Sequence, residues 1–294
     1  MPVGRVAEKT LRVRLDAVWT ELRASADATA ATLTAAEHVH RLRVATRRAL
    51  AAIDAFGDVL PARRRAWFEK RLARVRRVAG EARDLDVLSA RLSRQQTAET
   101  RSRRRLVAML SKQRDQSRAP IRELHEALTE EDWPARVDRL LENVARRRRQ
   151  PDFGDYASRH FKPMVADFFD VADGTLRHAA EMHAVRIQGK KLRYALEIFA
   201  AALPGKAVAR CRKSLEMMQQ SLGEFTDHAA AADRLARWAR RADAGANREF
   251  LAILRREETA LAAAARKKFT RWWNSDRRRS LRKRLEHASK RRSA

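Results

Sequence analysis

Cysteine, glycine, proline and aromatic residues are all scarce in this chain of 294 residues. Its single cysteine, Cys211, excludes a disulfide framework, a cysteine-rich zinc site and an iron–sulfur cluster, and is typical of a reducing compartment. Only 9 glycines and 7 prolines are present, too few for a sheet-rich fold with many turns. Much of the 45% hydrophobic content is alanine and leucine, which favour helices, so we expect an all-α protein.

Long apolar runs are also absent. No stretch of 18 apolar residues occurs, so we expect no membrane-spanning segment. The first residues, MPVGRVAEKTLRVRL, lack an apolar core of signal-peptide length, and we therefore expect a cytoplasmic protein.

Acidic residues are few relative to basic ones. The chain has 65 Lys and Arg against 37 Asp and Glu, a formal net charge of +28, and most of the bases are arginine. A field this positive attracts polyanions, which leaves nucleic acid, an anionic membrane or a phosphate polymer as partner classes.

Apolar residues spaced alternately by three and four predict helices along most of the chain. The clearest stripe begins at Val39, has the polar Thr46 as its weak point, and stops at Pro61. A second helix is predicted to end at Gly80 with a glycine cap, and another to end at Gly223.

An internal repeat with an offset of 143 residues organises the sequence. The segment that starts at His40 aligns with the one at His183, Leu60-Pro61 with Leu203-Pro204, and Gly80-Glu81 with Gly223-Glu224, without a gap over more than fifty residues. We therefore predict two helical bundles related by an approximate twofold axis. The expected halves cover residues 5–170 and 175–275 of a domain spanning 1–275, followed by a basic tail at 276–294.

Each repeat carries a row of basic residues beside its apolar stripe. At about 100° per residue, Arg43 and Arg47 lie within about 60° of His40 on a helix. The second row consists of His183, Arg186, Lys190 and Arg193, while Arg48 and Lys191 lie on the opposite flank. Like charges one turn apart destabilise a helix, so an anionic ligand would explain the rows. The alternative is that these bases are solvated or paired with acids on neighbouring helices.

The motif His40-x-x-Arg43-x-x-x-Arg47-Arg48, its echo at 183–191 and the segment Gly80-Glu-x-Arg-Asp84-Leu-Asp-Val-Leu88 resemble the CHAD domain, the conserved histidine α-helical domain, over about residues 10–275. The resemblance implies two four-helix bundles around a pseudo-twofold axis, with His and basic residues lining a central basic channel. It also implies binding of inorganic polyphosphate and, for some standalone members, association with polyphosphate or polyhydroxyalkanoate granules. The candidate polyphosphate-binding residues are His40, Arg43, Arg47, Arg48, Arg74, Arg77, His183, Arg186, Lys190, Lys191 and Arg193. Leu50 and Thr226 depart from the repeat, since Arg193 and Arg83 stand at the matching positions.

No pattern for catalysis accompanies these rows. The Glu-x-Glu-x-Lys strand of the triphosphate-tunnel hydrolases that often accompany CHAD domains is missing, as are the glycine-rich phosphate-binding loops. His38 and His40 point to different helix faces and have no further ligand at metal-binding spacing. We expect a standalone binding module that is not an enzyme and uses no cofactor or metal.

Two other functions use the same charge. A nucleic-acid-binding or nucleoid-associated protein is the main alternative, although the sequence shows no helix-turn-helix and no aromatic residues interleaved with the basic rows. A structural granule-coat protein is the other.

Several remaining residues are expected to be structural. Cys211 falls on the apolar stripe and is predicted to be a core thiol, and Asp84 and Asp227 are predicted to cap helices or pair with arginine. Trp272-Trp273 is expected to close the last helix against its bundle. The basic tail is either solubilising or a second polyanion-binding arm, in which Leu281 and Leu285 would form one face of a short helix.

Overall fold

The structure is a computed structural model that describes residues 1–28, 35–94, 101–146, 149–176, 178–241 and 246–289. Over these ranges the chain forms eleven α-helices and no strand, apart from an isolated bridge between Pro2 and Asp152. The prediction of an all-α fold is confirmed. None of the described helices combines the length and the apolar character that crossing a membrane requires.

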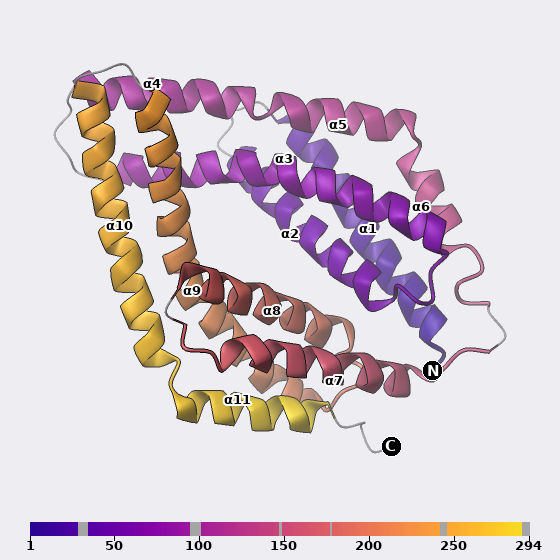
Figure 1. Ribbon diagram of the computed structural model, residues 1–294. Coiled ribbons are helices and arrows are strands. Elements are labelled where there is room, and N and C mark those ends of the chain that lie inside the picture. Colours follow the sequence, from indigo (N-terminus) through magenta and orange to yellow (C-terminus); the bar gives the residue numbers. More distant parts are fainter. Residues whose placement is uncertain (29–34, 95–100, 147–148, 177, 242–245, 290–294) are drawn as a thin grey trace. The chain divides into compact units, whose positions relative to one another are not determined.

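The helices divide into two compact units, residues 1–152 and 153–294 (Figure 1). In the first unit α1 packs against α2, and α2 packs against α3. The helices α4, α5 and α6 then return along α3 and α1. The bounds of the first unit's helices are α1 Val3–Asp27, α2 Ala35–Ala55, α3 Ala62–Arg94, α4 Arg101–Gln116, α5 Ala119–Glu130 and α6 Trp133–Leu141.

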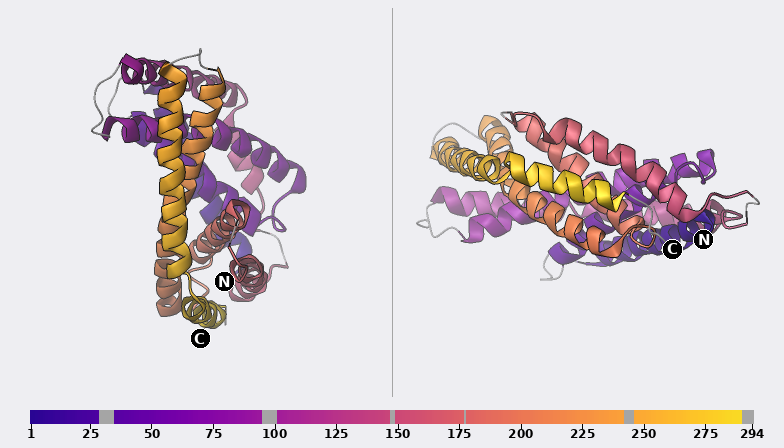
Figure 2. Two further views of the ribbon diagram at one scale, coloured as in Figure 1. Left: turned by 60° about the vertical axis from the view of Figure 1, so that its left-hand side comes forward. Right: turned by 90° about the horizontal axis from the view of Figure 1, so that it is seen from below.

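The second unit has two long helices, α9 and α10, which run side by side along most of their length (Figures 1 and 2). One end of α9 packs against α8, and α8 packs against α7. The last helix, α11, turns sharply away from α10 and lies against α9 and α7. The bounds are α7 Phe153–Ala172, α8 Ala179–Ile198, α9 Gly205–Arg241, α10 Ala246–Trp272 and α11 Ser275–Ala288.

The boundary between the units differs from the one expected near residues 170–175. Helix α7 belongs to the second unit, because its buried aromatic residues Phe161, Phe168 and Phe169 face a core shared with α8 and α11. The periodicity that predicted α7 shows which of its faces is apolar. It carries no information about which neighbour covers that face.

The expected basic tail is likewise part of the second unit over most of its length. Leu281 and Leu285 are buried, and Trp273 donates a hydrogen bond from its ring nitrogen to the carbonyl oxygen of Ala172 at 3.1 Å. Trp273 therefore closes the last helices against α7, as its position in the sequence predicted. Residues 290–294 of the tail lie outside the described residues.

Neither Gly80 nor Gly223 ends a helix, so this prediction was wrong. Helix α3 continues to Arg94 and α9 to Arg241, because the apolar stripe continues beyond each glycine. In α3 the buried residues Ala82, Leu85 and Leu88 extend it. A glycine inside a helix costs about 1 kcal/mol relative to alanine, and this packing outweighs that cost.

The helix ends keep the register of the sequence repeat. Helices α2 and α8 end at Ala55 and Ile198, and α3 and α9 begin at Ala62 and Gly205, in both cases 143 residues apart. At the weak point of the first stripe, the buried Thr46 donates its hydroxyl to the carbonyl oxygen of Leu42 at 2.7 Å. A polar residue on the stripe is thus satisfied within its own helix.

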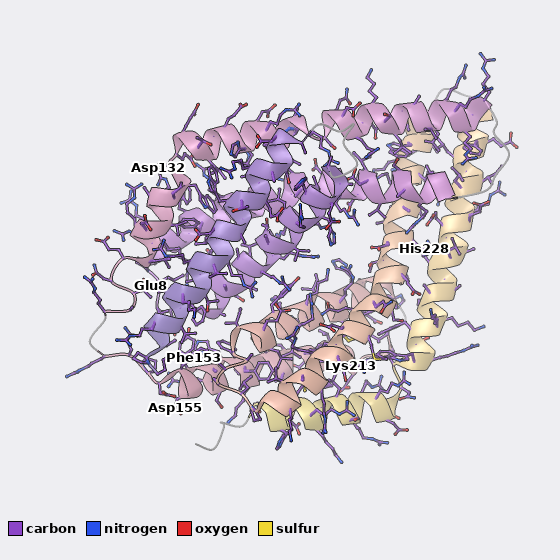
Figure 3. The ribbon with its side chains drawn as sticks, turned by 180° about the vertical axis from the view of Figure 1, so that it is seen from behind. Glu8, Asp132, Phe153, Asp155, Lys213 and His228 are labelled. Carbon is purple, nitrogen blue, oxygen red and sulfur yellow. The ribbon has the colours of Figure 1, made fainter. Side chains whose placement is uncertain are left out.

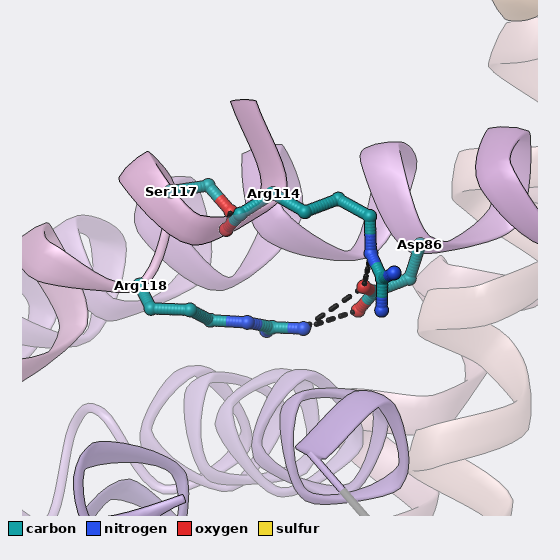
Figure 4. A network of polar contacts seen from close by, with 4 residues as sticks. All are labelled: Asp86, Arg114, Ser117 and Arg118. Carbon is teal, nitrogen blue, oxygen red and sulfur yellow. Dashed lines mark hydrogen bonds and ion pairs between the residues drawn. The ribbon is translucent and has the colours of Figure 1, made fainter. Parts of the chain in front are cut away.

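A buried ion pair ties α3 to the following helices (Figure 4). Both carboxylate oxygens of Asp86 accept from Nη2 of Arg118 at 2.9 Å, and one also accepts from Nε of Arg114 at 3.0 Å. Asp86 is 4% exposed and Arg118 only 1%. Asp86 stands in the segment that resembles the CHAD motif, and its role here is structural.

The second unit has a corresponding tie made of different residues. His228 of α9, labelled in Figure 3, lies 2.7 Å from a carboxylate oxygen of the buried Glu258 on α10. The repeat places Ala229 at the position of Asp86, so the polar link moves by one residue in the sequence. Both units therefore join their third helix to the next one through a buried carboxylate.

We predict that Asp86→Ala destabilises the first unit by about 3–5 kcal/mol, because it leaves the guanidinium of Arg118 buried without a counter-charge. Urea unfolding followed by circular dichroism measures the loss. The control is Asp84→Ala, which breaks an exposed ion pair on the same helix and should cost less than about 1 kcal/mol. Equal effects of the two substitutions would contradict the structural role of Asp86.

Candidate anion-binding site

The basic row of the first unit gathers at the side of α2 that meets α3. Arg43 of α2 donates to a carboxylate oxygen of Asp84 on α3 at 3.0 Å, with 30% of the Arg43 side chain exposed. His40, one turn earlier on α2, and Arg47, one turn later, are half-buried. The prediction that Asp84 pairs with arginine is confirmed.

The electrostatics of His40 show how closely the positive charges crowd together. Its pKa lies below the ordinary histidine value, first because burial disfavours the charged ring and next because of the positive charge of Arg83 on α3. Arg47 and Arg43 lower the pKa further, against an opposing effect of Glu37. Three arginines, two from α2 and one from α3, therefore act on this histidine together with Glu37.

Arg83 was missing from the residues predicted for this site. The repeat comparison contained the signal, because Arg83 belongs to the motif segment and is replaced by Thr226 in the second repeat. The hydroxyl of Thr226 donates to the carbonyl oxygens of Leu222 and Gly223, both at 3.1 Å. The second unit thus has no cation at this position on α9.

The basic row of the second unit lies along α8. His183 is exposed, and Arg186 and Lys190 are half-buried at successive turns of the same face. Arg193 extends the row but also interacts within its own helix. Its guanidinium lies 3.6 Å from a carboxylate oxygen of Glu197 and 4.9 Å from the ring centre of Tyr194. At this position the alternative interpretation, in which the base pairs with an acid, applies.

The remaining candidate residues lie at the edges of the rows or away from them. Arg48 is half-buried, and Lys191 is exposed on the flank of α8. Arg74 and Arg77 are exposed on α3. At 100° per residue Arg74 points half a turn away from Arg83, so it does not join the cluster around His40. Arg77 lies on the side of α3 that carries Asp84, two turns before it.

Cys211 is fully buried, as predicted, and burial raises the pKa of its thiol to about 11. A thiol with so high a pKa is protonated at neutral pH and a poor nucleophile. Within the described ranges, no group of three or more His, Cys, Asp and Glu side chains is placed to hold a metal ion.

Comparisons with known proteins agree with this architecture. The model of the CHAD domain family matches residues 14–236, and the chain belongs to this family. The crystal structure of the CHAD domain from the plant Ricinus communis is 21% identical in sequence and superposes with a TM-score of 0.72. The match covers 99% of this chain and 95% of the Ricinus chain. PptA from Streptomyces chartreusis is 20% identical, with coverage of 93% and 99% and a TM-score of 0.61. No curated protein matches the sequence.

We predict that Arg83→Ala raises the pKa of His40 toward the ordinary histidine value, because it removes the largest charge effect on that ring. A proton NMR titration of the histidine ring signals, with His40→Gln for assignment, measures the shift. Arg74→Ala removes the same charge from the other side of α3 and should leave the pKa of His40 unchanged. If both substitutions shift it alike, His40 senses only the net charge of the unit.

Proposed function

We propose that the protein binds inorganic polyphosphate through the basic rows of its two units. The observation that carries the proposal is that Arg43, Arg47 and Arg83 all act on His40, whose pKa is lowered first by burial and then by these charges, against an opposing effect of Glu37. Three guanidinium groups that act on one side chain make a region of positive potential that attracts an anion. Membership of the CHAD family supports the choice of polyphosphate among the possible anions.

Polyphosphate suits the chemistry of the rows. It is a flexible chain with about one charge per phosphate and no bases to read, so its binder requires cationic donors in a line and no aromatic platform. Arginine can donate to two phosphate oxygens at once, and lysine supplies a point charge. Release of condensed counterions then contributes much of the affinity, as it does for DNA.

The proposal has three further parts. The two units are related by an approximate twofold axis, and their rows line one basic channel. The protein acts in the cytoplasm, on polyphosphate or polyhydroxyalkanoate granules. It is a binding module that carries out no reaction of its own. The first part is supported by the 143-residue repeat and by the resemblance of the motifs to the CHAD domain, and the association with granules by that resemblance. The third is supported by the lack of the hydrolase strand and of glycine-rich phosphate-binding loops in this sequence.

We predict that the double substitution Arg186→Ala and Lys190→Ala weakens binding of long-chain polyphosphate at least tenfold, about 1.4 kcal/mol. Loss of two phosphate contacts should also reduce the slope of log affinity against log salt by roughly 2, at about 0.9 per contact. Titration of the full chain by fluorescence anisotropy at several salt concentrations measures both quantities.

The matched control is Arg210→Ala with Lys213→Ala, which removes the same charge from exposed positions on α9 (Lys213 is labelled in Figure 3). It should reduce the affinity less than threefold. Equal losses in the two variants would mean that only total charge matters. Duplex DNA is the competitor at about 0.15 M salt, and DNA that binds as tightly per charge as polyphosphate would favour the nucleic-acid alternative.

We predict that polyphosphate binds more tightly as the pH falls. The pKa of His40 is low in the free protein, and a bound polyanion raises it, so binding takes up a proton. The gain should therefore begin as the pH falls through the pKa of the bound histidine and level off below the lower pKa of the free one. Calorimetry in buffers of different ionisation enthalpy counts the protons taken up. His40→Gln should reduce this count, and an unchanged count would place the titrating group elsewhere.

A further inference from the structure

A second basic region lies on the second unit, where α10 ends and α11 begins, and no residue of the α8 row lines it. A hollow of about 550 Å³ opens there between the last two turns of α10 and the first turn of α11. Lys267, Lys268 and Arg271 line it from α10, and Arg277 lines it from α11. The rest of the lining is Ala264, Trp272 and Asn274, so no carboxylate contributes to it.

The charges of this hollow are poorly neutralised. Lys268 contacts Glu224 of α9 at 3.2 Å, with 69% of its side chain exposed. Among the described residues neither Lys267 nor Arg271, which are four positions apart on α10, has an ion-pair partner. Like charges at this spacing destabilise a helix by a few tenths of a kcal/mol. The arrangement therefore favours an anion that approaches several of these side chains at once.

Arg277 is held in place before any ligand arrives. Its guanidinium carbon lies 4.8 Å from the ring centre of Trp272, and its Nη1 donates to the carbonyl oxygen of Trp272 at 3.3 Å. Its backbone N–H donates to the side-chain oxygen of Asn274 at 3.0 Å, which caps α11. A guanidinium fixed on an aromatic ring loses little conformational entropy when it binds a ligand. The start of α11 adds the partial positive charge of a helix N-terminus.

We propose that this hollow binds a short phosphate chain, a di- or triphosphate group that is free or carried by a nucleotide. Its volume lies in the range of about 300–1,000 Å³ that small-molecule sites occupy. Lys267, Lys268 and Arg271 hold the phosphate oxygens. Arg277 closes the site from the other helix, and the plane of its guanidinium together with Trp272 offers a surface on which a base can stack.

This site is independent of the proposed binding of long polyphosphate, because it uses α10 and α11 and none of the residues of the α8 row. The α8 row presents cations at successive turns along one helix, which suits a long chain. The hollow brings cations from two helices together at one open place of limited size on the surface, which suits a short one. The two proposals can therefore fail separately.

The test is isothermal titration calorimetry of the full chain with tripolyphosphate and, separately, with ATP, at about 0.15 M salt. We expect saturable binding, and we expect Lys267→Ala with Arg271→Ala to weaken it at least tenfold. The control, Arg279→Ala with Lys283→Ala, removes one arginine and one lysine from exposed positions on α11 that do not line the hollow. It should change the affinity less than twofold.

The pattern of outcomes separates the possible ligands and the two sites. Tighter binding of ATP than of tripolyphosphate assigns the base to the surface made by Trp272 and Arg277, and equal binding assigns the site to the phosphate chain alone. Arg186→Ala with Lys190→Ala should leave both affinities within twofold. The proposal is overturned if neither ligand saturates, if the control loses as much affinity as the hollow variant, or if only the α8 variant loses it.

Discussion

Mutual repulsion among the 65 basic side chains is the constraint on which the rest of this structure depends. The 37 acids cannot neutralise them all, and several of the acids lie at junctions between helices. Asp86 joins α3 to α4 and α5, and Glu258 joins α9 to α10, both buried. Asp173, at the end of α7, pairs with Arg278 and Arg282 of α11. Carboxylates placed in this way add ion pairs between long helices to the packing of their apolar stripes.

Using acids at the junctions leaves other places with an excess of positive charge. Around His40, Asp84 is exposed and pairs with Arg43, while Arg47 and Arg83 also act on the histidine. In the hollow between α10 and α11 no carboxylate lines the wall. Repulsion at such places raises the free energy of the unliganded protein, and an anion that binds there recovers it. The positive charge concentrated at such places is thus available for binding.

The apolar periodicity of the sequence predicted where helices occur and which of their faces are buried. It did not predict where each helix ends or which residues of neighbouring helices meet. The stripe from Val39 fixed the face of α2 that is buried, and the 143-residue repeat matched the ends of α2 and α8. The prediction of a helix end at Gly80 failed because the local preference of glycine was weaker than the packing of the residues that follow it. The choice of Arg74 for the site and the omission of Arg83 have a different cause. Both are bases on α3, and only the rotation of that helix against α2 decides which one reaches His40.

The two repeats have also diverged in how they supply the same charge. Besides its histidine, the first unit presents Arg43 and Arg47 from α2 and Arg83 from the neighbouring helix α3. The second presents Arg186, Lys190 and Arg193 from α8 alone, and Arg193 shares its charge with Glu197. One arrangement crosses two helices and the other follows one. A ligand with directional groups would require the two copies to keep the same geometry. A flexible polyanion, the ligand proposed here, would require only that cations remain within reach along its length. It would tolerate Thr226 at the position of Arg83 and Leu50 at the position of Arg193.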